Sequence, residues 1–377
     1  VQPTQTDLAN FNRTVSAEYN IRRLDLDSEP IPESISTLLV VSPSRKLSDY
    51  ALFQLDQFLM RGNTLFLFLD SHSVITPQTN QYGGGQPAYI PRNTGIEELI
   101  EHYGIELEQA YVLDENCYVQ RQQTAQGGVN QMDIYFAPII EQSRYNGDLR
   151  FLSNMPEMVV LNMSPVRPTD SRSPETEAHM LFSSSDDGWT MEGDGINLSN
   201  PYMITPPPDE EQEPLPMGWI LEGPLDSYFS DREIPEPPEP EDESEADEEV
   251  EALDDVDVLT TRLAGGTGRL VVVGGSGMIG SNVLDGEGTN GNATFVLNTL
   301  DYLSGRESYA IMRTKGRSYA PLEETTATHR SFIKVFNIAG LPILVVLVGI
   351  VIWLARGARK RRIEAQFAGR TAGGSHE

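Results

Sequence analysis

Residues 335–355, VFNIAGLPILVVLVGIVIWLA, form a stretch of 21 residues without a charged side chain. At about 1.5 Å rise per residue, a helix of this length spans roughly 30 Å, the thickness of the hydrocarbon core of a bilayer. A buried core helix is the alternative, but core helices seldom stay uncharged over such a length. The sequence therefore predicts one transmembrane helix, which Pro342 should kink or loosen locally.

A basic cluster follows the apolar stretch directly, just after Trp353, which stands where an interfacial aromatic residue is expected. Its members are Arg356, Arg359, Lys360, Arg361 and Arg362. Basic residues of this kind flank membrane helices on the cytoplasmic side. We therefore expect a protein of the inner (cytoplasmic) membrane, with residues 356–377 in the cytoplasm and residues 1–334 extracytoplasmic, or periplasmic.

The start of the chain raises the question of how such a domain is exported. The sequence begins at Val1, with neither an initiating methionine nor a signal peptide. We expect a further membrane segment upstream, in a longer polypeptide of which this chain is the C-terminal part.

The charge balance limits the partners of the exported part. The chain has 56 acidic and 27 basic residues, and residues 1–334 alone have 54 and 21. A surface of this sign repels phosphates, so nucleic acid is not expected as a partner. Solubility, or a salty habitat, is the simplest reason for the acidity.

Cysteine and histidine are too sparse and too scattered to suggest a metal site. Cys117 is the single cysteine, so no intrachain disulfide can form. The five histidines fall into no pair with metal-ligand spacing. They are His72, His102, His179, His329 and His376. We expect no metal site from this spacing.

The hydrophobic pattern predicts an α/β fold with a doubly wound, mostly parallel sheet. Apolar runs at 37–43 and 64–70 read as strands, and the run at 64–70 has the continuous apolar character of a strand buried on both faces. Between them, the spacing predicts a helix that Ser48 caps and Gly62 ends. Strand, helix and strand in this order imply a right-handed crossover.

Further elements follow along the chain, with a weak signal over 119–215. We expect helices from Leu8 to Val15, near 94–104, and from a cap at Asn292. We expect strands at 19–26 (YNIRRLDL), 110–114, 157–162, 179–184, 217–223, 269–273 and, less regularly, 308–313 (SYAIMR), and a long loop over 71–93.

Residues 233–257 carry 14 carboxylates and no base. Such a segment cannot bury enough apolar surface to offset the entropy of ordering, so we expect a disordered loop. Calcium capture is the alternative, but the segment lacks the alternating ligand pattern of a calcium loop.

The run RLVVVGGSGMIG has the glycine spacing of a dinucleotide-binding turn at Gly275, Gly277 and Gly280. A true site needs a helix that begins within the motif and an acid at the end of the next strand, about 20 residues on. Here a loop follows Gly280, and Asp301 lies inside a predicted helix. We therefore expect no nucleotide cofactor, and interpret the glycines as a permissive turn at the strand end.

A second group of interest, Asp70, Ser71 and His72, follows the strand at 64–70, where α/β proteins place ligand sites. We treat it as a speculative ligand-facing strand end. A Ser and a His adjacent in sequence do not make a catalytic triad, and turn formation is the simpler role.

Several segments together resemble one family, the extracytoplasmic auxiliary components of ABC transport systems of the gliding-motility (GldG) type. The similar segments are TLLVVSP through GNTLFLFLD, YGIELEQAYVLDENCY, LFSSSDDGW, WILEGPLDSYF, RLVVVGGSGMIGSN with ATFVLNTLDYLSG, and FNIAGLPILVVLVGIVIWLARGARKRRI. They cover nearly the whole chain in family order.

The resemblance implies an α/β domain like that of intraflagellar-transport proteins, related to amidotransferase-like folds, and assembly with a membrane permease and a cytoplasmic ATPase. It implies no catalytic residue. We expect an exported domain over 1–232 and 258–334, interrupted by the acidic loop, then the membrane helix at 335–355 and a basic tail at 356–377.

The expected function is that of a non-catalytic accessory subunit that contacts cargo or couples the transporter to the cell envelope. Two alternatives stay open at this point. One is a hydrolase with its site near Asp70 to Ser73, and the other is an acidic, calcium-dependent surface or adhesion module.

Overall fold

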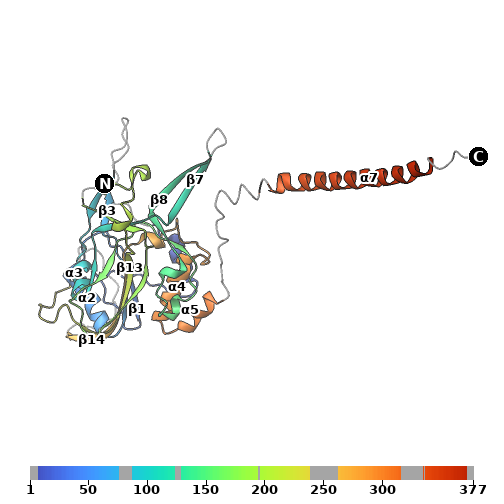
Figure 1. Ribbon diagram of the computed structural model, residues 1–377. Coiled ribbons are helices and arrows are strands. Elements are labelled where there is room, and N and C mark those ends of the chain that lie inside the picture. Colours follow the sequence, from blue (N-terminus) through green and yellow to red (C-terminus); the bar gives the residue numbers. More distant parts are fainter. Residues whose placement is uncertain are drawn as a thin grey trace, which may run out of the picture. The chain divides into compact units, whose positions relative to one another are not determined.

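The computed structural model describes residues 7–75, 87–123, 129–193, 196–237, 262–315, 334 and 336–371 (Figure 1). The chain forms two units, Val1–Ser318 and Tyr319–Glu377. The α-helices are α1 (Ala9–Ser16), α2 (Asp49–Met60), α3 (Ile96–His102), α4 (Gly291–Leu303), α5 (Glu307–Thr314) and α7 (Leu341–Thr371).

The first unit also holds fourteen strands among its described residues. They are β1 (Thr37–Val41), β2 (Thr64–Phe68), β3 (His72–Ile75), β4 (Ala88–Pro91), β5 (Ile105–Leu107), β6 (Ala110–Asp114), β7 (Cys117–Gln123), β8 (Val129–Ile140), β9 (Met158–Val159), β10 (Val166–Pro168), β11 (Glu177–Ser183), β12 (Gly188–Glu192), β13 (Pro216–Asp226) and β14 (Gly265–Val273). Short 3-10 turns include η4 (Pro201–Met203) and η7 (Gly277–Ile279).

Five strands form the central sheet in the order β1-β2-β14-β13-β11. β1, β2 and β14 run parallel, whereas β13 is antiparallel to both of its neighbours, β14 and β11. The sheet is therefore mixed, and the expected mostly parallel, doubly wound order is not found. In this sheet, the α/β pattern is limited to the β1–α2–β2 crossover and to the parallel pairing of β14 with β2.

Helices cover both faces of this sheet, as the ribbon in Figure 1 shows for α2 and α3 on one side and α4 on the other. Alternate residues of β2 point to opposite faces: Leu65 and Leu67 join the cluster with α2 and α3, and Phe66 and Phe68 join the cluster with α4. As expected from the sequence, β2 is apolar throughout because both of its faces are buried.

Three expected elements differ in the structure. Residues 20–26 form no strand; the side chain of Gln54 binds this region instead, through the carbonyl oxygen of Leu26 at 2.6 Å. Residues 308–313 lie in α5. Asn290 caps α4 by accepting from the amide of Ala293 at 3.0 Å, while buried Asn292 binds the carbonyl oxygens of Val159 and Met278.

Two hairpin-like pairs also lie where the sequence pattern is weak. The expected loop over 71–93 contains β3 and β4, which pair antiparallel, and the weak region after residue 119 contains β7 and β8. β3 and β4 are only four residues long each, and β7 is largely polar, so neither pair gives a regular alternation. Most of the acidic stretch, from residue 238 on, lies outside the described residues.

Buried carboxylates fasten the helices to their neighbours. Asp56 of α2 accepts hydrogen bonds from the amide of Tyr228 at 2.8 Å and the hydroxyls of Ser227 and Tyr103, at 2.7 and 2.5 Å. Asp301 of α4 forms ion pairs with Arg306 at 2.7 Å and Arg313 at 2.8 Å. Both carboxylates are fully buried, and such groups are tolerated only when paired in this way.

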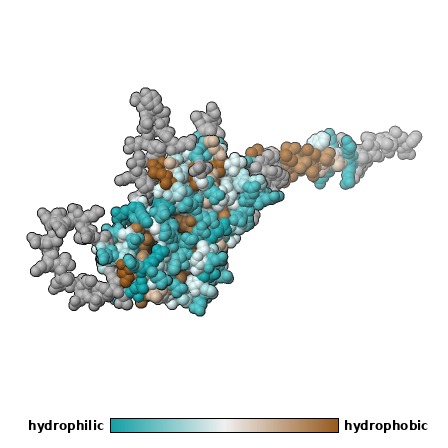
Figure 2. All heavy atoms as spheres, turned by 90° about the vertical axis from the view of Figure 1, so that its left-hand side faces the viewer, coloured by the Kyte–Doolittle hydropathy of each residue, from teal (hydrophilic) through white to brown (hydrophobic). Residues whose placement is uncertain are grey.

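The second unit contains α7, whose residues Pro342–Arg362 form the one helix among the described residues that is long and apolar enough to cross a membrane. None of this span is buried against other parts of the protein. Pro342 is the second residue of α7 and follows a π-helical turn, Phe336–Gly340, so it begins the regular helix rather than kinking its interior. In Figure 2, α7 is brown over its apolar part and teal where the basic residues begin.

Gly274 gives a direct test of how tightly the end of β14 is packed. A β-carbon at Gly274 would lie 2.1 Å from the carbonyl oxygen of Ser164, so Gly274→Ala forces two backbone segments apart. We expect a loss of about 1–3 kcal/mol in the free energy of unfolding, measured by denaturant titration.

Gly147→Ala is the matched control, because a β-carbon there meets nothing within 4 Å. We expect it to be neutral or slightly stabilising. Equal effects of the two substitutions would contradict the close approach at Gly274.

Candidate functional site

Asp70 joins the carboxyl ends of the three parallel strands. It lies two residues beyond β2, and its carboxylate accepts from the amide of Ser276 at 2.6 Å and from the Ser276 hydroxyl at 2.9 Å. The hydroxyl of Ser42 also donates to it. Ser42 follows β1 and Ser276 follows β14, so one carboxylate holds all three strand ends together.

Arg92, which follows β4, contacts both Asp70 and the residues around it. Its Nη1 lies 3.8 Å from the Asp70 carboxylate and donates to the carbonyl oxygens of Ser42 and Pro43, at 3.2 and 3.1 Å. Its Nε donates to the Ser73 hydroxyl at 3.1 Å. Ser42 is held in the left-handed backbone region, at φ +40°, which such a set of bonds can maintain.

Ser71 and His72 form a separate buried chain beside Asp70. The Ser164 hydroxyl donates to Ser71 Oγ at 2.6 Å, and Ser71 Oγ lies 2.8 Å from His72 Nδ1. If each hydroxyl donates onward, Nδ1 accepts, and the imidazole is neutral with its proton on Nε2. Burial lowers the pKa of His72, which favours the same neutral form.

Tyr111 covers the His72 ring, with ring centroids 5.2 Å apart. Burial raises the pKa of Tyr111 well above its ordinary value, and the charge of Asp70 raises it further. Tyr111 therefore stays a neutral phenol at any ordinary pH, and acts here as a packing surface for His72.

The three residues singled out in the sequence are thus adjacent but do not converge as a triad. The Asp70 carboxylate turns toward Ser42 and Ser276, while Ser71 and His72 bind toward Ser164 and Tyr111. Within the described residues, no carboxylate is bonded to His72. Ser42, Arg92, Ser164 and Ser276 complete the group. Of these, Ser42 and Ser276 could have been found because they follow apolar strands, whereas Arg92 and Ser164 carried no signal.

The glycines of the motif face the protein's own backbone. A β-carbon at Gly277 would lie 2.1 Å from the carbonyl oxygen of Leu161, and one at Gly275 would lie 2.8 Å from the sulfur of Met163. Residues 277–279 form only the short turn η7, and α4 begins at Gly291. The space that a pyrophosphate would need is filled by residues 161–164. We expected these glycines to serve a permissive turn; in the structure they allow close packing against residues 161–164.

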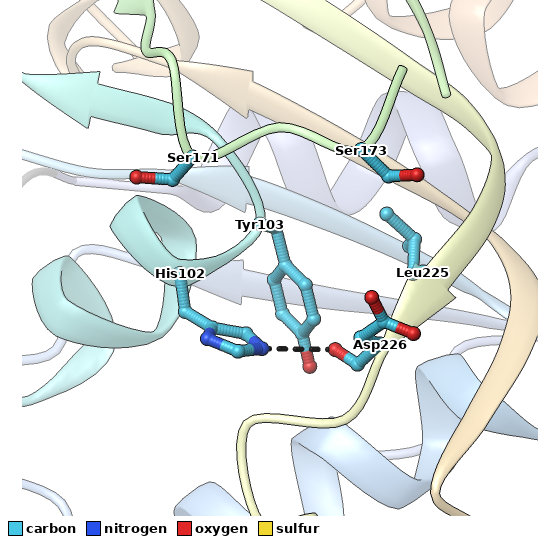
Figure 3. A pocket seen from close by; sticks show the side chains of 6 residues that line it. All are labelled: His102, Tyr103, Ser171, Ser173, Leu225 and Asp226. Atoms are coloured by element: carbon cyan, nitrogen blue, oxygen red, sulfur yellow. Dashed lines mark hydrogen bonds between the residues drawn. The ribbon is translucent and has the colours of Figure 1, made fainter. Parts of the chain in front are cut away.

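Two hollows lie at opposite ends of the central sheet, since Asp226 pairs with Gly265 at the start of β14 and Ser276 follows its end. A cleft of about 360 Å³ beside the strand end is lined by Ser71, Arg92, Glu97, Glu101, Glu106, Leu107 and Gln109. A smaller pocket of about 200 Å³ lies beyond α3 (Figure 3), where His102 Nε2 donates to the carbonyl oxygen of Asp226 at 3.0 Å. Figure 3 shows Ser171 and Ser173 above the His102 and Tyr103 rings, on the segment between β10 and β11.

The remaining residues of interest are placed as follows. Cys117 is buried at the start of β7, and burial raises its pKa to about 12. In the part of the chain that the structure describes, no three His, Cys, Asp or Glu side chains are arranged to hold a metal ion. Exposed basic residues lie on the α7 helix, just beyond its apolar part; they are Arg356, Arg359, Lys360, Arg361 and Arg362.

Asp70→Ala should loosen the strand ends. It leaves the amide of Ser276 and two hydroxyls without their acceptor, so we expect the free energy of unfolding to fall by about 1–3 kcal/mol, measured by denaturant titration. Asp148→Ala, at an exposed position, is the control and should change stability by less than about 0.5 kcal/mol. A neutral Asp70→Ala would show that the carboxylate does not hold the strands.

His72 should make stability depend on pH. Since its pKa is lower in the folded than in the unfolded protein, the unfolded chain takes up a proton first as the pH falls through about 6.5. Stability from this group is therefore present above that pH and lost below it. We expect His72→Phe to flatten the slope of unfolding free energy between pH 7 and pH 5, measured by denaturant titration at each pH. An unchanged slope in His72→Phe would contradict the effect of burial on this imidazole.

Comparison with known proteins identifies the family of this chain. A family model described as an ABC-type uncharacterized transport system matches residues 2–299. No curated protein matches the sequence. Among solved structures, the mmIFT52 N-terminal domain is similar with a TM-score of 0.42 and 13% identity, over 79% of this chain and 91% of that one. A likeness at this level carries no argument about the site.

The family match spans most of the chain, including the central sheet, the strand-end residues and nearly all of α4. The protein therefore belongs to this family of auxiliary components of ABC-type transport systems.

Proposed function

We propose that the protein is a membrane-anchored, extracytoplasmic and non-catalytic subunit of an ABC transporter, with a permease and a cytoplasmic ATPase as its partners. The observation that carries the proposal is α7: its apolar span has no buried surface and is followed directly by five basic residues, in a chain of an ABC auxiliary family. The order of the similar sequence segments further favours the gliding-motility (GldG) type.

The direction of the span follows from the basic residues. Arg356, Arg359, Lys360, Arg361 and Arg362 all lie on the C-terminal side of the apolar part of α7. The positive-inside rule then assigns the C-terminal end to the cytoplasm and the unit Val1–Ser318 to the outside of the inner (cytoplasmic) membrane. A strongly acidic surface is compatible with that location, since it needs no contact with nucleic acid.

The bonding at the strand end supports the non-catalytic part of the proposal. Asp70 is engaged by Ser42 and Ser276, and Ser71 is bonded on both sides. A nucleophile must be able to reach its substrate, but only 3% of Ser71 is exposed. These contacts favour a structural role and leave the hydrolase without a specific observation in its support.

Cargo contact is assigned to the same edge of the sheet. The cleft beside Ser71 and Arg92 has a volume within the range of small-molecule sites, and ligands of α/β proteins bind outside the carboxyl ends of parallel strands. Of the three residues Asp70, Ser71 and His72, Ser71 lines this cleft and would face the cargo, without taking part in a reaction.

The acidic segment 233–257 is assigned as an insertion in a surface loop. Its two flanks are held together: Arg262 donates from Nη1 to the carbonyl oxygen of Phe229 at 3.1 Å and to that of Arg232 at 2.8 Å. A loop whose ends are tied can lengthen at little cost to the fold. The exported domain then comprises 1–232 and 258–334, with the membrane helix at 335–355 and the basic tail at 356–377.

Purification of the full-length protein in mild detergent tests the assembly. We expect a permease and an ATPase to co-purify in fixed ratio, because the accessory subunit has no phosphate-binding loop of its own. A C-terminal fluorescent-protein fusion should fluoresce and a C-terminal alkaline phosphatase fusion should stay inactive, since both report a cytoplasmic end.

Four substitutions to Glu should invert or mix the orientation of the membrane helix, at Arg359, Lys360, Arg361 and Arg362. Exchanging Arg and Lys among these positions should leave the orientation unchanged. The transporter role is wrong if neither a permease nor an ATPase is found in the complex. An active C-terminal phosphatase fusion would overturn the orientation alone.

A further inference from the structure

The strands β7 and β8 form a two-stranded arm that extends from the first unit, as Figure 1 shows. Their pairing runs from Tyr118 opposite Ile134 to Gln123 opposite Val129. Among the described strands β8 also pairs with β9, through Ile139 and Ile140 at its base, and the Asn130 side chain donates to the Tyr202 hydroxyl at 2.9 Å. An isolated two-stranded ribbon is marginally stable in water, so an arm of this kind gains from further strands.

The outer edge of β7 is open along this arm. Within the described residues β7 pairs with β8 alone, and Gln120, Arg121, Gln122 and Gln123 are all exposed. Natural edge strands are commonly protected by proline, lysine, a bulge or a covering segment. β7 has neither proline nor lysine, its one charged side chain is Arg121, and its single register shift lies at its base, between Cys117 and Tyr118. Its outward N–H and C=O groups are therefore placed to bind another strand.

The arm is also nearly free of charge in a strongly acidic protein. Across the 7 residues of β7 and the 12 of β8, only Arg121 and Asp133 are charged, whereas the whole chain has a net charge of −29. Two copies of an acidic protein repel each other over most of their surface. At this edge the repulsion is smallest, and the two charges are of opposite sign.

We propose that β7 pairs antiparallel with β7 of a second copy of this chain, about a twofold axis at Gln120. This register places Val119 opposite Arg121 of the second copy, and Tyr118 opposite Gln122. Because Val119 pairs with Asp133 within the arm, Arg121 of the second copy lies in the same row of the sheet as Asp133. No like charges are opposed.

Neighbouring registers are less favourable. An axis at Arg121 would set two guanidinium groups directly opposite each other, which destabilises a strand pair. An axis at Val119 would bring Arg121 opposite Cys117, which is buried at the base of the arm. The Gln120 register also covers Tyr118, a large aromatic side chain that is 50% exposed in the single chain. The result is a four-stranded sheet, built equally from both copies.

Disulfide trapping with the full-length protein in detergent tests this register. In Gln120→Cys the two thiols meet at the axis, where opposed Cα atoms of an antiparallel pair lie about 4.5–5.5 Å apart, within the range of a disulfide. In Gln123→Cys, the matched control on the same exposed edge, the equivalent Cα atoms lie roughly 20 Å apart and cannot be bridged. Both variants are made in a Cys117→Ala background, because this register sets Cys117 directly opposite position 123 of the second copy.

We expect mild oxidation to convert most of Gln120→Cys to a covalent dimer and to leave Gln123→Cys monomeric on a non-reducing gel. Maleimide labelling of the reduced proteins verifies that both thiols are accessible. Equal cross-linking of the two variants would indicate random collision and overturn the proposal. If the introduced thiol of Gln120→Cys is accessible but does not cross-link, the proposal is overturned as well. The partner of the β7 edge would then be a strand of a different protein.

A charge substitution gives a second readout without cysteine. Gln120→Lys opposes two ammonium groups at the axis, so the dissociation constant of the dimer, measured by light scattering on dilution, should rise by about fivefold. Gln123→Lys adds the same charge away from the axis and should change it much less. Equal responses to the two lysines would contradict the register.

Discussion

One carboxylate, Asp70, sets the geometry at the edge of the central sheet where a ligand would meet this fold. Parallel strands β1, β2 and β14 leave three chain ends side by side, and each must turn away without leaving its polar groups unpaired. Asp70 meets that requirement for two neighbours at once, by accepting from Ser42 and Ser276. Arg92 then neutralises the charge and fixes the unusual backbone of Ser42. The segment 161–164 can cross over this edge only because glycines stand at the end of β14.

The sequence predicted the five strands of the central sheet and missed most of the short strand pairs outside it. The apolar runs of β2 and β14 account for their prediction, although β14 begins at Gly265, before the predicted residue 269, and α2 follows from its cap at Ser48. The direction of β13 could not be predicted, because a run such as WILEG fits a parallel or an antiparallel neighbour equally well. Residues 308–313 were predicted as a strand, but they lie in α5, where Arg313 forms its ion pair with Asp301 of α4, a contact between segments that no local pattern records.

The candidate site was predictable in part for the same reason. Asp70 could be predicted because it follows an apolar strand. Ser276 could have been predicted in the same way, because it lies in the glycine run that follows β14. Arg92 and Ser164 come from regions without periodicity, and they reach the site through the tertiary fold alone. The glycine spacing has its cause in contacts with residues distant in sequence, which no local pattern records.

The ion pairs of α5 have a mechanical consequence. α5 is the last helix of the first unit, and the chain continues from it toward α7 in the second. Arg306 and Arg313 both hold Asp301 of α4, and Arg313 also holds Glu18 beyond α1. A force applied to the first unit through the chain that leads to α7 acts first on α5. The two ends of α5 are held by ion pairs with the buried carboxylate of Asp301. The load is thereby spread over α4 and the N-terminal segment, so that the domain resists tension as one body rather than unravelling from its C-terminal end.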